Sequence, residues 1–269
     1  MDAFLNLNEL SESSIKTYNA SYNKLTDLLG QPIEESNPRN IIRKINTVTN
    51  PNSQKALIVI LRKMYPEVKA YHVMFRHLKK KIAEYKDKSL ANLTLPSVFE
   101  LKRFMDTAYL NGEYKKYIIN YLLINFNVRN KDLDLIITTK RDLIDDDKNY
   151  LYVASSYISY IRNDYKTVKT YGEKRFPIKS TKFYRAVTNF LGEDETKYLF
   201  NLKDSEVHIA PSTIGKMVRK YTLDEVGESI YFKAIVLDLV KNGNTKQIDQ
   251  LSRRRGTDVN TIIDSYLKE

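Results

Sequence analysis

Near the end of the chain, one tyrosine follows a cluster of arginines, and these residues could do chemistry on a phosphate. Tyr266 lies in the segment "TIIDSYLKE", downstream of the basic segment "LSRRRG" at residues 251–256. A phenol, with a pKa of about 10, becomes a useful nucleophile only where cations and a general base surround its target. Val259 and Ile262 share one helical face with Tyr266, which a purely structural tyrosine would also show. The segment is therefore compatible with a nucleophile and with a core residue.

The charge balance indicates the class of partner that such chemistry would serve. The 269 residues include 44 Lys and Arg against 33 Asp and Glu, a formal net charge of +11. A surface with this excess attracts polyanions, and nucleic acid is the first to consider. The sequence has no run of about 18 apolar residues and no signal-peptide pattern. We therefore expect a soluble, intracellular protein in a DNA-containing compartment, with no membrane partner.

Cysteine and histidine usage excludes several other chemistries. The chain has no cysteine, and its three histidines, His72, His77 and His208, show no metal-ligand spacing. Disulfides, thiolate catalysis and Cys/His zinc sites are therefore excluded. We expect neither a metal nor a cofactor, and we expect His208 to lie in a loop.

The first part of the chain has the periodicity of a compact helical unit. Apolar residues recur every three or four positions over residues 11–29, and a glycine and a proline follow to end that helix. Asn37 and Pro38 form a plausible cap and first turn of a second helix. Two more helices are predicted over residues 52–65 and 66–88, separated by a proline.

A second unit follows a linker at residues 86–97, where the periodicity is lost, so we predict domains at residues 1–88 and 97–269. Its strongly apolar segment at residues 114–126 should be a central buried helix. Residues 149–178 are rich in Tyr, Val, Ile and Thr and contain turn signals, which predicts a three-stranded antiparallel sheet. Helical patterns then resume. The predicted fold class is mainly α with a small antiparallel sheet.

Two helical units, an inserted sheet, a basic balance and a terminal tyrosine together resemble the tyrosine recombinase, or phage integrase, family. The chemical relatives of that family are the type IB topoisomerases. The resemblance implies an N-terminal helical core-binding domain of the SAM-like kind and a C-terminal catalytic domain, which clamp duplex DNA between them. It also implies a homo-oligomer, commonly a tetramer on two DNA sites.

The resemblance places the first catalytic arginine of the family at Arg129, in "NVRNKDL", with Asp132 at the acidic position that follows. A guanidinium offers bidentate hydrogen bonds and a permanent charge where negative charge builds on a phosphodiester. The family lysine, a general acid in a β-hairpin, aligns with Lys169 in "VKTYGEKRFPI". Lys166 is the alternative if the hairpin register shifts. A surface arginine and solvated hairpin lysines are the competing interpretations.

The remaining positions of the family pattern are altered. Its H-x-x-R motif falls on Ser229 and Phe232, and Lys233 is the cation that could take over the arginine's contact. Lys lacks the fork of Arg, so this replacement changes the chemistry. Thr257 stands where the last histidine is expected, and the spacing from Gly256 puts Tyr266 at the nucleophile position. Phe232 as a core residue and Lys233 as a solvated one remain the alternative.

Several basic residues would contact the DNA backbone in such a protein, and solvated helix faces are their other interpretation. These candidates are Lys79, Lys80, Lys81, Lys166, Lys216, Arg219, Lys220, Arg253, Arg254 and Arg255.

The resemblance implies a site-specific recombinase, or integrase, that breaks and rejoins DNA through a 3′-phosphotyrosyl intermediate. Arg129, Lys169, Lys233, Thr257 and Tyr266 would form its catalytic set. The altered motif favours an alternative, a catalytically degenerate DNA-binding protein of architectural or regulatory role on the same fold. A helical protein-interaction module is disfavoured by the charge balance and the sheet placement. The abundance of Asn, Lys and Ile and the compact size would suit a virus or mobile element.

Overall fold

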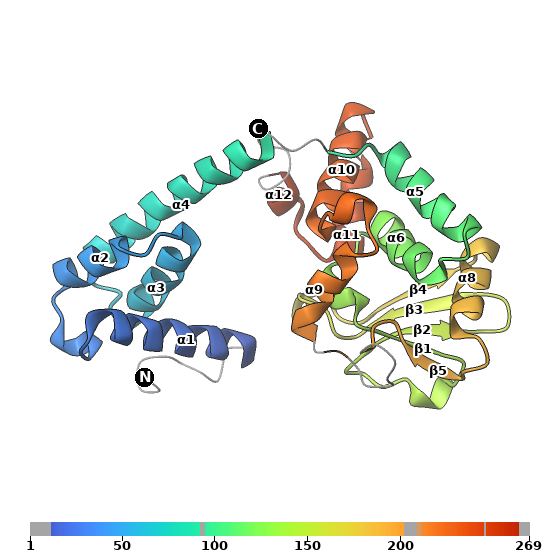
Figure 1. Ribbon diagram of the computed structural model, residues 1–269, viewed down its shortest axis with the longest axis horizontal. Coiled ribbons are helices and arrows are strands. Elements are labelled where there is room, and N and C mark those ends of the chain that lie inside the picture. The colour runs from blue at the N-terminus through green and yellow to red at the C-terminus, as the bar shows by residue number, and fades with distance from the viewer. Residues whose placement is uncertain (1–11, 92–94, 202–208, 210, 245, 264–269) are drawn as a thin grey trace. The chain divides into compact units, whose positions relative to one another are not determined.

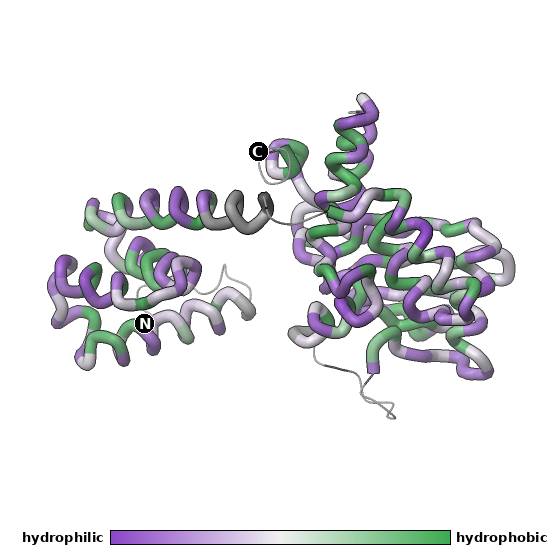
Figure 2. The backbone as a smooth tube through the Cα atoms, turned by 45° about the horizontal axis from the view of Figure 1, so that its top comes forward, coloured by the Kyte–Doolittle hydropathy of each residue, from purple (hydrophilic) through white to green (hydrophobic). Residues whose placement is uncertain are grey.

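The computed structural model describes residues 12–91, 95–201, 209, 211–244 and 246–263. The chain divides into two compact units, Met1–Leu93 and Thr94–Glu269 (Figure 1). In both units hydrophobic and hydrophilic segments alternate along the helices (Figure 2), as expected for helices that bury one face. The assignment of these units to core-binding and catalytic roles stays a prediction. No helix of the described residues is both long and apolar enough to cross a membrane.

All regular structure described in unit 1, over residues 12–91, is helical. Asn37 and Asn50 cap two of its helices by accepting hydrogen bonds from first-turn amides, and a proline follows each cap. Leu25, Ile45 and Leu61 lie fully buried in its core. The elements are α1 (Glu12–Leu29), η2 (Ile33–Glu35), α2 (Pro38–Asn46), α3 (Pro51–Met64) and α4 (Lys69–Ala91).

Unit 2 combines helices with one sheet. α8 packs against β1 and β2, and α6 packs against α8 and α5, so the main core lies between sheet and helices (Figure 1). The helices are α5 (Val98–Leu110), α6 (Tyr114–Phe126), α7 (Val168–Tyr171), α8 (Thr181–Leu191), α9 (Pro211–Arg219), α10 (Glu228–Lys241), α11 (Lys246–Arg255) and α12 (Val259–Ile262). Short 3₁₀ helices are η3 (Asn130–Leu133), η4 (Arg141–Leu143) and η5 (Leu223–Glu225).

The sheet has the strand order β4-β3-β2-β1-β5. The strands are β1 (Leu135–Thr138), β2 (Asn149–Val153), β3 (Ile158–Arg162), β4 (Lys174–Ile178) and β5 (Thr196–Tyr198). The fold class of helices with a small sheet is confirmed, but the sheet is mixed and five-stranded, because β1 pairs with β2 in parallel. β1 is a short run buried on both faces, which periodicity cannot distinguish from helix, and β5 has only three residues. The predicted antiparallel arrangement holds for β2, β3 and β4.

The central helix α6 positions the first candidate residue. It buries Tyr117, Ile118 and Leu122 in the core, as its apolar sequence predicts. Asn127 then adopts the left-handed conformation, with φ of 53°, and ends the helix. Because of this turn, Arg129 leaves the helix end directly and begins η3 as its cap residue.

Candidate functional site

Three segments that are distant in sequence meet around the side chain of Arg129. Its Nη1 donates a hydrogen bond to the carbonyl of Arg255 at 2.7 Å, and its Nη2 donates to the hydroxyl of Thr257 and, at 3.4 Å, to the carbonyl of Gly256. The third segment is the β3–β4 hairpin, where Thr167 donates to the carbonyl of Gly256 at 2.8 Å. The structure thus brings together two predicted catalytic residues, Arg129 and Thr257.

A buried ion pair underlies this junction. Arg162, at the end of β3, is fully buried, and its Nη2 donates to Asp132 Oδ2 at 2.5 Å. The same carboxylate oxygen accepts the backbone amide of Arg129 at 2.8 Å, and Arg162 Nη1 donates to the carbonyl of Arg254 at 2.6 Å. Breaking such a pair leaves an uncompensated buried charge. Asp132 therefore orients both arginines by holding the turn and the strand together.

Lys174, the first residue of β4, is the hairpin lysine that reaches the junction. Its Nζ donates to the carbonyl of Arg253 and lies 5.4 Å from the centre of the Tyr165 ring. Burial, and then the charge of Arg162, lowers the pKa of Lys174 to about 8. Lys166 and Lys169 are exposed and make no hydrogen bond or ion pair with any residue that the structure describes.

Sequence reasoning missed Lys174, and the reason is local. The hairpin contains a short helix, α7, which carries Lys169 on its exposed surface instead of letting it point at the junction. The one signal available in the sequence was the position of Lys174 immediately before "RFPI", where the returning strand begins.

Arg255 occupies the space beside Phe232. Its guanidinium lies 3.8 Å from the centre of the Phe232 ring, its Nη2 donates to Glu228 at 2.9 Å, and its Nη1 donates to the carbonyl of Asn127 at 3.0 Å. The side chain is buried. Phe232 stands where the resemblance expects an arginine, so α10 presents a ring on which a guanidinium from α11 rests. Lys233 is half-buried and makes no hydrogen bond or ion pair within the described part of the chain.

The cluster carries more positive than negative charge. Arg129, Arg162, Lys174 and Arg255 face the carboxylates of Asp132 and Glu228, so two positive charges are unbalanced. Burial, and then the charge of Arg255, lowers the pKa of Arg129 from its ordinary value. An anion in this place would relieve the repulsion between these cations. The cluster therefore carries uncompensated positive charge, although its side-chain donors are engaged within the protein.

Gly256 allows the turn after α11 to approach the hairpin. Its φ is +63°, and a Cβ on it would lie 2.7 Å from Thr167 Oγ1 and 3.1 Å from a carbon of the Tyr165 ring. Only glycine fits both the backbone conformation and the space. This position therefore determines how closely the carbonyls of residues 253–256 approach Arg129 and Lys174.

The other predicted residues lie on the surface or outside the described chain. Arg253 and Arg254 are exposed, and their side chains contact Asp249 and the carbonyl of Asn125. Tyr266 and His208 lie outside the described residues. The remaining DNA-binding candidates are exposed on α4 and around the end of α9: Lys79, Lys80, Lys81, Lys216, Arg219 and Lys220.

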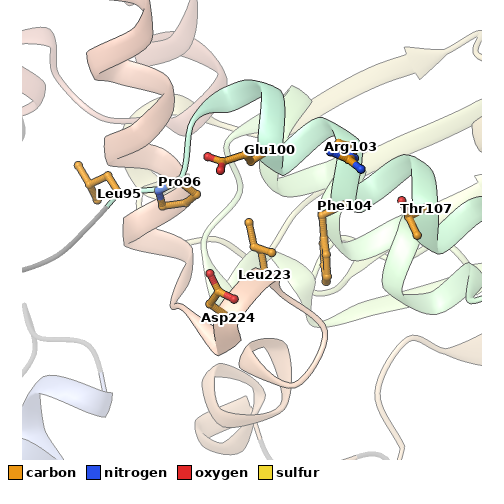
Figure 3. A pocket seen from close by; sticks show the side chains of 8 residues that line it. All are labelled: Leu95, Pro96, Glu100, Arg103, Phe104, Thr107, Leu223 and Asp224. Atoms are coloured by element: carbon orange, nitrogen blue, oxygen red, sulfur yellow. The ribbon is translucent and has the colours of Figure 1, made fainter.

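No described group of three or more acidic, histidine or cysteine side chains could hold a metal ion. A separate pocket of about 420 Å³ lies between the start of α5 and η5. Figure 3 shows the residues that line it: Leu95, Pro96, Glu100, Arg103, Phe104, Thr107, Leu223 and Asp224. It contains none of the predicted catalytic or DNA-binding residues.

The structure titled "Crystal structure of XerA recombinase" is similar to this chain, with a TM-score of 0.40 and 18% sequence identity. The match covers 94% of this chain and 86% of that one. No family model and no curated protein matches the chain.

Proposed function

We propose that this protein binds duplex DNA and breaks and rejoins its strands through a tyrosine nucleophile. The observation that carries the proposal is the convergence of Arg129 and Lys174 on the turn at residues 253–257, upstream of Tyr266; Arg255 of that turn donates in return to the carbonyl of Asn127, two residues before Arg129. Cations gathered from three segments, with positive charge in excess, are what a phosphodiester substrate requires. The resemblance of the sequence to the tyrosine recombinase family supports the same function.

In the proposed reaction, Tyr266 Oη forms a bond to the phosphorus while the bond from phosphorus to the 5′-oxygen breaks. The ammonium of Lys174 gives its proton to the departing 5′-oxygen, and the phenol proton leaves to solvent. A lysine with a pKa of about 8 is a better acid near neutral pH than an ordinary lysine. Arg129 would hold the non-bridging oxygens in its fork. Rejoining reverses these steps with another 5′-hydroxyl.

Lys174 thus takes the role that the sequence suggested for Lys169 or Lys166. Arg255 is the candidate for the second guanidinium of the site, ahead of Lys233, because its carbonyl accepts a hydrogen bond from Arg129 at 2.7 Å and its guanidinium donates to Asn127, at the turn that precedes Arg129. Thr257, which accepts a hydrogen bond from Arg129, would donate its hydroxyl proton to the phosphate. The assembly of several copies on DNA belongs to the proposal as well.

One observation favours a second function, a DNA-binding protein without catalysis. The donors of Arg129, Arg162 and Lys174 are already used by carbonyls of residues 253–256. Arg255 is held by Glu228 and Phe232. A phosphate would have to displace these carbonyls, so catalysis requires the turn at residues 253–257 to move. If it does not move, the cluster is structural and only the exposed lysines and arginines meet DNA.

A covalent trap separates the two functions. Nicked duplexes would be selected from a random pool by native binding, incubated with the protein and denatured in SDS. We expect a covalent protein–DNA adduct that is absent in Tyr266→Phe and strongly reduced in Lys174→Gln. Lys169→Gln, the same charge change on the same hairpin, is the matched control and should leave the adduct intact. DNA binding without any adduct would establish the second function instead, and no binding at low salt would reject both.

A further inference from the structure

A second cationic site lies at the opposite end of α6 from Arg129. Its pocket of about 500 Å³ falls in the size range of small-molecule sites. Because α6 has 13 residues, the two ends are separated by about 20 Å. The lining comes from the start of α6, the end of α8, β5 and the segment after α9: Tyr114, Lys115, Phe190, Lys197, Lys220 and Tyr221.

Lys115 is an ammonium without an acidic partner among the described residues. Its Nζ lies 4.8 Å from the centre of the Phe200 ring and 5.2 Å from that of Tyr221. Burial, and then the charge of Lys197, lowers the pKa of Lys115 to about 8. Aromatic faces compensate such a cation only in part, so an anion in the pocket would stabilise it.

The other charges of the pocket add to this excess. Lys116 pairs with Glu113 at 2.8 Å, and Lys197 pairs with Asp194 at 3.0 Å. Lys220 is exposed and has no acidic partner in the described part of the chain, so Lys115 and Lys220 are uncompensated. The first turn of α6 also lacks a side-chain cap, so the positive end of the helix dipole faces the same region.

Aromatic rings complete the chemistry of the pocket. Tyr114, Phe190 and Tyr221 line it beside the two uncompensated lysines. Rings give a flat apolar surface on which a base can stack, and the ammonium groups lie within the same pocket to meet a phosphate. We propose that this pocket binds a nucleotide, with the base against the aromatic rings and the phosphate on Lys115 and Lys220.

A free nucleotide and a nucleotide extruded from a DNA strand offer the same chemistry. This binding does not depend on the strand-transfer proposal, because none of the residues of the Arg129 cluster lines the pocket. Lys220 is shared only with the predicted DNA-backbone contacts.

Calorimetric titration of the full chain with AMP, ATP and inorganic triphosphate tests the proposal. We expect saturable nucleotide binding that is weakened about tenfold by Lys115→Gln and by Lys220→Gln. Lys179→Gln, which removes an exposed lysine elsewhere in unit 2, is the control and should bind as the unchanged protein does. Lys220→Gln alters an exposed side chain without a described partner, so its result does not depend on the folding of the Lys115 variant.

The ring contribution is tested by comparing ligands. ATP should bind about tenfold more tightly than inorganic triphosphate, and Tyr221→Leu should remove that difference. Equal affinity of ATP and triphosphate for the unchanged protein, or the absence of saturable binding, would overturn the proposal. A short single-stranded oligonucleotide that displaces AMP at a lower concentration than ATP does would assign the ligand to a DNA strand; the reverse order would assign it to the free nucleotide pool.

Discussion

The two ends of α6 hold their cations in different ways. At the Arg129 end, guanidinium groups are fixed by backbone carbonyls and by the carboxylates of Asp132 and Glu228. At the Lys115 end, an ammonium rests over aromatic rings without an acidic partner that the structure describes. Arginine presents a rigid fork, whereas lysine is a point charge on a flexible chain. The first end is therefore organised before a ligand arrives, and the second is open to one.

The largest effect should come from removing the carboxylate of Asp132, which organises the Arg129 end of α6. Asp132→Ala leaves Arg162 buried without its partner, so we expect a loss of about 3–5 kcal/mol in the free energy of unfolding. Urea denaturation measures it. Glu193→Ala, at an exposed site, should change stability by less than about 0.5 kcal/mol. A loss below about 1 kcal/mol for Asp132→Ala would mean that the pair does not organise the cluster.

The next largest loss of stability should come from a side chain at Gly256, where the turn approaches the hairpin closely. Gly256→Ala combines a left-handed backbone with a Cβ that would lie 2.7 Å from Thr167 Oγ1, so we expect a loss of roughly 2–4 kcal/mol. Gly243→Ala is the matched control, because Gly243 follows the end of α10 as Gly256 follows that of α11, its φ is +68° and no atom lies within 4 Å of its Cβ; it should lose about 1–2 kcal/mol. Equal losses in thermal denaturation would show that the hairpin moves aside freely.

The lysines of the two ends should titrate alike although their partners differ. The pKa values of Lys174 and Lys115 are lowered to about 8 from the ordinary 10.5, chiefly by burial. Both should be charged at pH 7 and largely neutral at pH 9. Between about pH 8 and pH 10.5 each lysine binds a proton in the unfolded chain but not in the folded one. The free energy of unfolding should therefore increase as the pH rises through this range.

NMR of protein with ¹³C-methylated lysines measures these titrations. Two resonances should titrate near pH 8, one lost in Lys174→Gln and the other in Lys115→Gln. A nucleotide should move only the Lys115 titration to higher pH, because a phosphate favours the charged ammonium. If it moves both titrations equally, the two ends are not independent.

The smallest expected effects distinguish the exposed lysines that would contact DNA from those that line the pocket at the Lys115 end of α6. Lys216→Gln and Lys220→Gln should each weaken duplex DNA binding modestly and reduce the slope of log K against log salt by about one. Lys220→Gln alone should also weaken nucleotide binding, because Lys216 does not line the pocket. Filter binding at several salt concentrations gives the slopes. Unchanged slopes would remove both residues from the proposed DNA surface.

The sequence predicted the parts of this molecule that depend on neighbouring residues. The apolar run at residues 114–126 predicted α6, and Arg129 follows the end of that helix as expected, while its catalytic role stays a prediction. Arg162 could not be found in this way, since a charged residue at the end of a strand is buried only through a partner 30 residues away. The family spacing indicated Lys169 because α7 is too short to be visible as a pattern. The pocket at the Lys115 end of α6 is lined by residues from separate elements, so no local sequence pattern could predict it.

The contacts of Arg129 also determine when the site can form as the chain is made. The hydrogen-bond partners of its side chain lie 126 to 128 residues further along the sequence. At about 5–20 residues per second, synthesis of that stretch takes roughly 6–25 s. During this interval the lysines of α4 have already been made, while the arginine cluster still lacks its last segment. A ribosome-bound chain therefore carries the basic residues of α4 before the arginine cluster can be completed.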